Sequence, residues 1–245
     1  ETLGALVLAA RACHDIALAY RTPFISGKDS LNNEYSHEGE TLAIPHTLLI
    51  SAIGQVDNVR QCVTMDLKEP GNSLCITGLT RLELGGSHWS LVKHEEGGHV
   101  PQVDPVLGRA LFKAMHAAIT RGLVRSCHDL SEGGLAVALA EMALAGGLGA
   151  KVLLDNVPHS PDASHNCALL FSESPSRFVL EVRPEHVSRA AAIFQDLPFA
   201  AIGSVTVSSA GGKEARLSIL GLDAKAVIDA PVAELKAAWQ GPLNW

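Results

Sequence analysis

The sequence predicts an α/β protein, in the broad sense that includes α+β, and three features of its 245 residues point to this class. Helical and strand-like patterns follow one another along the chain, as expected of a sheet covered by helices. The composition, 47% hydrophobic and 18% charged, suffices for a sizeable core in one large or two smaller domains. Two glycine-containing turns, at residues 27–30 and 129–134, carry residue types that bind phosphate and cations.

Charge and cysteine content narrow the function classes. The net charge of -7 and the pI near 5.9, without a dense Lys/Arg cluster, argue against a nucleic-acid partner or an electrostatic membrane anchor. The five cysteines are scattered and lack CxxC spacing, so neither a disulfide framework nor a zinc site is indicated. No apolar run approaches the roughly 20 residues of a membrane span, and no signal-peptide pattern is present. We therefore expect small-molecule chemistry in the cytoplasm, without nucleic acid or membrane.

A helix and a strand are predicted in the first part of the chain. Apolar residues recur at steps of three and four between Leu3 and Tyr20, which predicts an amphipathic helix that docks on a core. After Pro45, the run Thr47 to Val56 (TLLISAIGQV) predicts a largely buried strand. Because the chain opens at Glu1 directly in the helical pattern, we expect it to be a fragment of a longer protein.

The stretch Pro23 to Tyr35 (PFISGKDSLNNEY) is the first candidate site. Gly27 permits a turn, and Lys28, Asp29 and Ser30 then supply an ammonium, a carboxylate and a hydroxyl in successive positions. Such groups bind phosphates and metal ions. The motif is not a P-loop, because GxxxxGK[ST] requires an earlier glycine that this stretch lacks at that spacing.

The middle of the chain predicts a boundary and then a second unit. A Pro-Gly turn indicates a linker over residues 61–71. Ser73 to Gly78 (SLCITG) predicts a short strand, and Leu82 to Ser90 (LELGGSHWS) a glycine loop that either packs tightly or approaches a ligand. A long helix is expected after Asp104, because this residue suits an N-cap, the following proline suits the first helical position, and the helical period persists.

The stretch His128 to Gly147 (HDLSEGGLAVALAEMALAGG) is the second candidate site. We expect a strand to end at Asp129 and a helix to begin at Gly133-Gly134. Such a turn presents backbone N–H groups and the positive end of a helix dipole to an anion, and Asp129 is placed to hold a cation against it. In the alternative interpretation, Asp129 and Ser131 only cap the helix and the glycines allow close packing.

The remaining chain contains one further polar turn of interest. Leu169 to Val182 (LLFSESPSRFVLEV) predicts a turn between apolar segments, in which Glu173 and Ser174 face either a ligand or solvent. Neighbouring Ser, His, Cys and Asp residues elsewhere do not indicate a hydrolase, because a triad is assembled in space and not by sequence adjacency. Further strands are predicted at 151–154, 200–207 and 216–220, and helices at 185–195 and 231–239.

Six sequence blocks resemble, in this order, the second half of the phosphoribosylformylglycinamidine synthase family. They are PFISGKDSLNNEY, IPHTLLISAIGQVDNV, TMDLKEPGN, ELGGSHW, CHDLSEGGLAVALAEMA and LFSESPSRF. The family belongs to the wider aminoimidazole ribonucleotide synthetase superfamily, whose members bind ATP between a paired A domain and a B domain. The resemblance implies a truncated A domain at 1–60, the linker at 61–71, a B domain with a mixed sheet and flanking helices at 72–220, and a helical tail at 221–245.

The resemblance also implies a reaction. Such enzymes convert formylglycinamide ribonucleotide to formylglycinamidine ribonucleotide in de novo purine synthesis, with ATP, Mg²⁺ and ammonia from glutamine. The implied partners are the first half of the synthetase, a glutamine amidotransferase subunit or domain, and a small bridging subunit. The family's catalytic histidine, main magnesium carboxylates and glutaminase cysteine lie outside this region, so we expect no catalytic residue here and no activity of the chain alone. Two alternatives stay open: a structural module that holds ADP-Mg, or another superfamily member such as aminoimidazole ribonucleotide synthetase.

Site residues follow from the resemblance position by position. Gly27 and Lys28 are assigned to ATP, and Ser30 to the substrate. Relatives carry asparagine where Lys28 stands, and an ammonium cannot ligate a cation, so the metal is assigned to Asp29.

The second motif and the polar turn contribute the rest of the implied site. Asp129 is a further metal ligand, and Ser131, Glu173 and Ser174 line an auxiliary nucleotide site. Pro175 departs from the glutamine of the family's ESQ-type element, which weakens a polar contact at that position.

Overall fold

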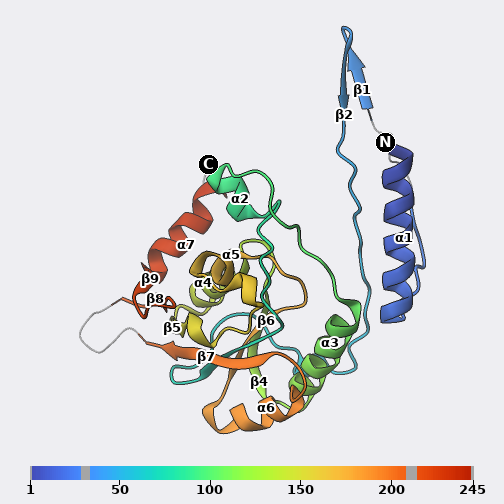
Figure 1. The fold of residues 1–245 in the computed structure, drawn as a ribbon. Coiled ribbons are helices and arrows are strands. Elements are labelled where there is room, and N and C mark those ends of the chain that lie inside the picture. The colour runs from blue at the N-terminus through green and yellow to red at the C-terminus, as the bar shows by residue number, and fades with distance from the viewer. Residues whose placement is uncertain (1, 29–33, 208–213, 244–245) are drawn as a thin grey trace. The chain divides into compact units, whose positions relative to one another are not determined.

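The computed structural model describes residues 2–28, 34–207 and 214–243 (Figure 1). The chain divides into two compact units, unit 1 up to Asp57 and unit 2 from Asn58 onward. Asp29 and Ser30 of the first candidate site lie outside the described residues. Their assigned roles therefore stay predictions.

Unit 1 begins with α1 (Thr2–Tyr20), which confirms the predicted opening helix. Among the described residues of unit 1 its apolar stripe packs on no core, since Leu3, Val7 and Leu18 are 72%, 52% and 66% exposed. By length and composition alone, Leu3–Tyr20, with a mean hydropathy of 1.4, suffices to cross a membrane. The expectation that no run approaches a membrane span is too strict for this helix, although core helices of soluble proteins and signal sequences meet the same criteria.

A β-hairpin that the sequence did not predict lies in unit 1. β1 (Glu34–His37) pairs antiparallel with β2 (Glu40–Ala43). The two turn residues, Glu38 and Gly39, have positive φ values of 51° and 86°. Positive φ at both central positions is what a tight two-residue hairpin requires, and the glycine adopts it without steric cost.

The buried strand predicted at Thr47–Val56 is wrong. The segment forms no strand, and Leu49 and Ile53 are 88% and 90% exposed. Its apolar and β-branched composition is not sufficient, because a strand needs a hydrogen-bonded neighbour. Among the described residues of unit 1, no segment pairs with it.

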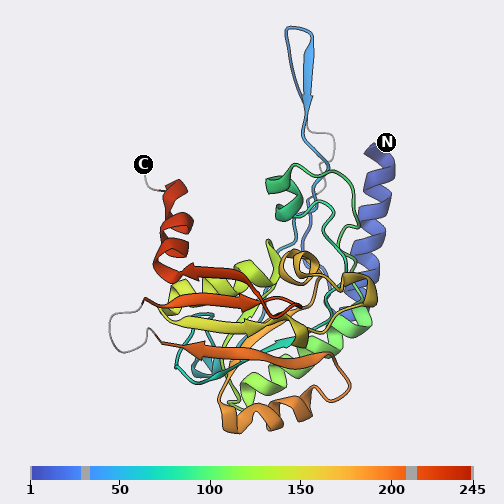
Figure 2. The same cartoon turned by 60° about the vertical axis from the view of Figure 1, so that its left-hand side comes forward.

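Unit 2 contains a seven-stranded mixed sheet in the order β4-β6-β3-β7-β5-β8-β9 (Figures 1 and 2). Neighbouring strands are antiparallel except β5 and β8, which are parallel. The mixed sheet with flanking helices confirms the predicted fold class. The strands are β3 (Ser73–Thr77), β4 (Val124–Asp129), β5 (Gly149–Leu153), β6 (Phe178–Val182), β7 (Phe199–Thr206), β8 (Arg216–Leu220) and β9 (Ala226–Pro231).

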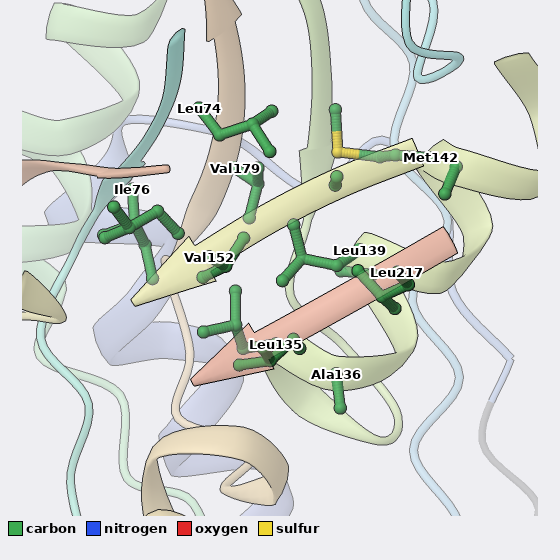
Figure 3. Packing of buried hydrophobic residues seen from close by; sticks show 14 of the residues in the cluster. Leu74, Ile76, Leu135, Ala136, Leu139, Met142, Val152, Val179 and Leu217 are labelled. Carbon is green, nitrogen blue, oxygen red and sulfur yellow. The ribbon is translucent and has the colours of Figure 1, made fainter. Parts of the chain in front are cut away.

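Helices cover both faces of this sheet. Along β3, Leu74 and Ile76 belong to one core and Cys75 to the other, as expected when successive strand residues point to opposite faces. The first core includes Leu139 of α4 (Figure 3), and the second includes Leu111 of α3. The helices of unit 2 are α2 (His88–Lys93), α3 (Pro105–Thr120), α4 (Gly134–Gly146), α5 (Asn166–Phe171), α6 (Val187–Ile193) and α7 (Val232–Gln240).

The start of α3 confirms the predicted cap. Asp104 Oδ1 accepts hydrogen bonds from the N–H groups of Val106 at 3.1 Å and Leu107 at 2.9 Å. Pro105 occupies the first turn, where a missing N–H costs nothing. Local chemistry therefore determines where this helix begins.

The segment predicted as a linker, 61–71, belongs to unit 2 and is attached to the sheet. Glu181 of β6 accepts hydrogen bonds from the N–H groups of Lys68 at 2.7 Å and Glu69 at 3.0 Å. A buried carboxylate thus fixes this segment, which a Pro-Gly turn alone could not indicate. The assignment of 1–60 and 72–220 to A and B domains stays a prediction.

The end of the chain differs from the predicted helical tail at 221–245. β9 adds to the sheet beside β8 before α7 begins. Ile219 lies opposite Ile228, and Arg216 Nε donates to Asp229 Oδ1 at 2.8 Å. These are cross-strand pairs, and a short segment with no strong alternation does not reveal them in sequence.

Candidate functional site

The first candidate site is described only in part. Gly27 and Lys28 lie in an exposed, non-helical stretch of unit 1 after α1. A Cβ at Gly27 would meet no atom within 4 Å, so packing among the described residues does not require glycine at this position. The ATP-binding roles of both residues stay predictions.

The second candidate site is a pocket of about 400 Å³ in unit 2, where β4 passes into α4. Asp129 stands at the end of β4, as predicted, and α4 begins at Gly134 after the glycine pair. Ser131 is exposed and lies between them. The lining residues are His88, His128, Asp129, Ser131, Glu132, Gly133, Val137, Ala138 and Glu141.

The glycine pair is required by backbone geometry. Gly133 and Gly134 have φ values of 76° and 62°, in the left-handed region that favours glycine. A Cβ at Gly134 would lie 2.6 Å from the carbonyl oxygen of Ser172. Glycine therefore lets the start of α4 approach the chain after α5.

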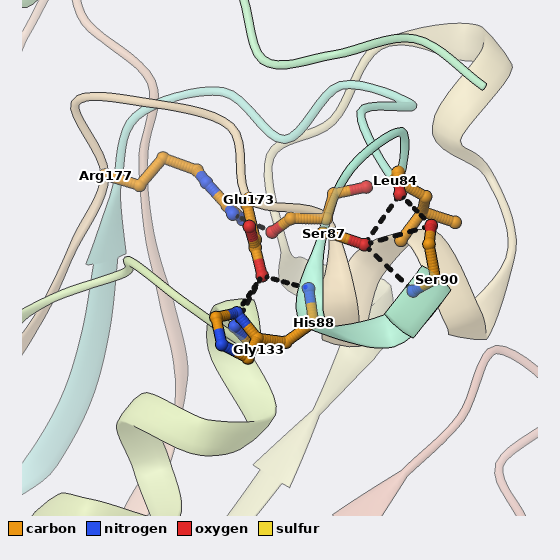
Figure 4. Close-up of polar contacts among 8 residues, drawn as sticks. Leu84, Ser87, His88, Ser90, Gly133, Glu173 and Arg177 are labelled. Atoms are coloured by element: carbon orange, nitrogen blue, oxygen red, sulfur yellow. Dashed lines mark hydrogen bonds and ion pairs between the residues drawn. The ribbon is translucent and has the colours of Figure 1, made fainter. Parts of the chain in front are cut away.

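A carboxylate from the polar turn lies at the N-terminus of α4 (Figure 4). Glu173 Oε1 accepts hydrogen bonds from the N–H groups of Gly133 at 2.8 Å and His88 at 2.9 Å. The imidazole Nδ1 of His88 lies 3.4 Å from the same oxygen. The alternative in which Asp129 and Ser131 cap α4 does not hold, because Gly133 is the N-cap and no side chain caps it from that position.

A second polar network lines the same pocket. His128 Nε2 lies 2.8 Å from Glu141 Oε2, and His128 Nδ1 lies 3.2 Å from Asp129 Oδ1. Two carboxylates therefore flank one imidazole ring, and the Asp129 side chain remains 60% exposed.

The acids of this pocket suit a cation that arrives with a ligand. In the described ranges 2–28, 34–207 and 214–243, no group of three or more His, Cys, Asp or Glu side chains is placed to hold a metal ion. Magnesium in nucleotide sites is usually held by one or two carboxylates together with phosphate oxygens and water. An exposed Asp129, with Glu132 in the same lining, fits that pattern.

Ser174 lies inside the protein and contacts the backbone of Arg81. It is fully buried, and its Oγ accepts a hydrogen bond from Arg81 N at 2.9 Å. The turn is therefore not solvated at this position, and its assignment to a nucleotide site has no exposed atom to support it. Its role as a ligand contact stays a prediction.

Arg177 stabilises the same turn from inside. Its guanidinium is buried and donates to Ser174 O at 2.9 Å, to Thr80 Oγ1 at 3.0 Å and to Ser172 O. Burial lowers the pKa of Arg177 to about 10, against the opposing effect of the Glu83 and Glu173 carboxylates. Glu173 thus faces both the pocket and a buried positive charge.

Of the lining residues, only Asp129 and Ser131 were predicted as site residues, and the unpredicted ones include His88, His128 and Glu141. His88 lies in the glycine loop, for which approach to a ligand was one of two interpretations, and His128 stands in the second motif, where it suggested only a hydrolase. Glu141 had no sequence signal, because it reaches His128 only through the packing of α4 beside β4. Long-range placement brings these residues together with Asp129.

Comparisons with protein families and curated proteins agree with one another. Residues 69–213 match the family model "AIR synthase related protein, C-terminal domain". The phosphoribosylformylglycinamidine synthase subunit PurL of Alkaliphilus metalliredigens is 35% identical over 226 residues, 91% of this chain and 28% of that protein. The PurL subunit of Synechocystis sp. is 38% identical over 239 residues, 94% of this chain and 30% of that protein. The chain thus spans less than a third of the length of these relatives.

Solved structures give the same fold. Thermotoga maritima PurL complexed with ATP is 26% identical with a TM-score of 0.59, covering 72% of this chain and 27% of that chain. The PurLQS structure from the same organism is 25% identical with a TM-score of 0.60, covering 72% of this chain and 28% of that chain. The hydrogenase maturation protein HypE in complex with ATP, at 16% identity and a TM-score of 0.50, covering 71% of this chain and 55% of that chain, shares the fold alone.

Proposed function

The chain belongs to the family of AIR synthase related proteins, through their C-terminal domain, and on this premise we propose that it is the C-terminal part of a phosphoribosylformylglycinamidine synthase. The observation that carries the proposal is the similarity to PurL subunits over 91% and 94% of the chain. The reaction is ATP-dependent amidation of formylglycinamide ribonucleotide in de novo purine synthesis. The chain supplies one part of that enzyme and does not turn over alone.

Within this proposal the chain's residues bind and orient, while catalysis needs groups from elsewhere in the synthase. Gly27 and Lys28 contact ATP, Asp29 the cation and Ser30 the substrate. Magnesium supplies charge neutralisation at the phosphates when it is bound. The Lys28 ammonium cannot ligate a metal ion. Its role in this proposal is to place a further positive charge beside the phosphates.

The pocket at the start of α4 is proposed as a nucleotide site of unit 2. Asp129 offers an exposed carboxylate to a cation, and Ser131 offers a hydroxyl beside it. The acidic lining favours a nucleotide that carries magnesium over a free anion. Solved relatives include Thermotoga maritima PurL complexed with ATP and with ADP, which supports nucleotide binding in this fold.

The proposed partners are the first half of the synthetase, a glutamine amidotransferase and a small bridging subunit. Support comes from the similarity to the structure of PurLQS from Thermotoga maritima. We also propose a cytoplasmic location, in line with scattered cysteines that form no disulfide among the described residues.

The proposal is tested by complementation. The chain is mixed with a protein that comprises the first half of a PurL subunit, and association is verified by size-exclusion chromatography. Ammonia-dependent ADP formation in the presence of formylglycinamide ribonucleotide is expected from the mixture and from neither part alone. Lys28→Ala should lower this rate, whereas Lys225→Ala, at an exposed ion pair with Asp223, should not. Association without activity would refute the proposal.

The second candidate function is a structural module that holds ADP-Mg in the α4 pocket. It is favoured by the position of that pocket at a helix N-terminus with an exposed carboxylate nearby. It predicts that ADP binds with magnesium and is not consumed, and that Asp129→Asn weakens binding without changing turnover in the complemented enzyme. Loss of turnover in Asp129→Asn would exclude a purely structural role.

A further inference from the structure

The Glu173 carboxylate contacts two residues that line the α4 pocket, Gly133 and His88 (Figure 4). One oxygen, Oε1, accepts hydrogen bonds from Gly133 N at 2.8 Å and His88 N at 2.9 Å. Gly133 is the N-cap of α4, so this oxygen also lies at the positive end of the helix dipole. Backbone N–H groups at such an end are what a phosphate oxygen would otherwise use.

The side chains around the Glu173 carboxylate are mostly acidic, which affects the binding of an anion. Asp129, Glu132 and Glu141 line the pocket, against the imidazoles of His88 and His128. Glu173, whose Oε1 contacts His88 and Gly133 of this lining, is a fourth carboxylate beside the two imidazoles. A free phosphate or pyrophosphate entering this pocket would meet like charges and find the best N–H donors already bonded.

We propose that Glu173 is a specificity-determining residue that holds the anion position of the pocket and thereby excludes free phosphates, so that a nucleotide enters only with its magnesium. This inference rests on the proposed nucleotide role of the pocket and adds the selectivity of that site. It assigns Glu173 to exclusion, which differs from the direct nucleotide contact that the family resemblance implies. A bound magnesium ion neutralises the phosphates and is ligated by the carboxylates of the pocket, so the phosphates are no longer repelled by these carboxylates.

The competing explanation is that Glu173 only compensates the buried Arg177. Its carboxylate opposes the lowering of the pKa of Arg177, and so does Glu83. A purely compensating role predicts that removal of Glu173 changes stability and leaves the anion selectivity of the pocket as it was. Selectivity and stability are measured separately, which distinguishes the two explanations.

The test measures binding of inorganic pyrophosphate, without divalent cations, to the full chain by calorimetry. Glu173→Ala should bind pyrophosphate about tenfold tighter than the unmodified chain, because the N–H groups of Gly133, at the start of α4, and of His88 become available to it. Glu132→Ala is the matched control, since it removes one carboxylate from the same lining without freeing a backbone donor. Its gain should be less than about threefold, the effect of one exposed charge.

The amide signals of the chain give an independent readout. In Glu173→Ala, addition of pyrophosphate should shift the ¹⁵N–¹H resonances of Gly133 and His88, and these shifts should be absent in the unmodified chain. If Glu173→Ala does not fold, Glu173→Leu replaces it, since leucine keeps most of the side-chain volume and has no acceptor for the two N–H groups, and a gain above that of Glu132→Ala is still expected. No gain, or an equal gain in Glu132→Ala, would overturn the inference. Failure of the unmodified chain to bind ADP with magnesium would count against the proposed nucleotide role and would leave this result intact.

Discussion

Replacement of Glu181 by glutamine should destabilise unit 2 by about 2 kcal/mol, because the fully buried carboxylate accepts four hydrogen bonds. Oε1 accepts from Glu69 N at 3.0 Å and Asn72 Nδ2 at 2.6 Å. Oε2 accepts from Lys68 N at 2.7 Å and Ser126 Oγ at 2.9 Å. All four groups donate, so an amide NH₂ at either position faces a donor.

The magnitude follows from the better of the two amide orientations. With the NH₂ at the Oε2 position, the Ser126 hydroxyl can rotate and accept, whereas the Lys68 N–H loses its acceptor. A lost hydrogen bond to a charged group costs about 1.5–3 kcal/mol, and the remaining bonds weaken when the charge is removed. Relief of the buried charge offsets part of this cost, which leaves about 2 kcal/mol.

Urea unfolding followed by tryptophan fluorescence measures this effect. None of the three tryptophans of the sequence lies before Asp57, so unit 1 contributes no tryptophan fluorescence, and Trp89 and Trp239 report unit 2. The control Glu185→Gln lies at an exposed position and should change stability by less than about 0.5 kcal/mol. If Glu181→Gln unfolds at the same urea concentration as the control, the hydrogen-bonded carboxylate does not stabilise unit 2 as described.

Three further outcomes are expected. Asp129→Asn should weaken binding of ADP with magnesium about tenfold, because one anionic ligand is lost while the shape is kept; unchanged affinity by calorimetry would count against a ligand role. Gly134→Ala should lower the free energy of unfolding by about 3 kcal/mol, because backbone strain at φ 62° adds to a Cβ that would lie 2.6 Å from a carbonyl oxygen. The control Gly147→Ala, at φ 63° with no atom within 4 Å of the added Cβ, should lower it by about 1 kcal/mol through the strain alone. Equal melting temperatures of the two variants would refute the close approach. Burial raises the pKa of Cys75 to about 12, so at pH 8.5 less of it is thiolate, and alkylation followed by mass spectrometry should find it at least about 100-fold slower than the exposed Cys62; comparable rates would show that Cys75 is not buried.

Local chemistry made several elements predictable. Asp104 and Pro105 define the start of α3 through a cap and a fixed φ, and the glycine pair defines the start of α4. These signals act within a few residues of where they stand. For the same reason the candidate pocket could be placed at Asp129 before its lining was known.

Other features depend on contacts between distant residues. Thr47–Val56 has strand-like composition but no neighbour that pairs with it among the described residues, whereas β9 gains strand structure from β8. Glu173 reaches Gly133 across 40 positions, and Glu181 reaches Lys68 across 113. Sequence periodicity carries no information on contacts between such distant residues, so the hydrogen bonds of Glu173 to Gly133 and His88 were not predictable.

The measurement that tests the proposed function most directly follows the glycinamide carbonyl oxygen of the substrate. Formylglycinamide ribonucleotide labelled with ¹⁸O in the amide carbonyl of its glycinamide part is incubated with ATP, magnesium and ammonia, together with this chain and the first half of a PurL subunit. If this amide oxygen is activated by phosphoryl transfer and leaves with the phosphate when ammonia attacks, the inorganic phosphate should carry one ¹⁸O per turnover, and only when this chain is present. Unlabelled phosphate, or labelled phosphate formed without the chain, would contradict the proposed function.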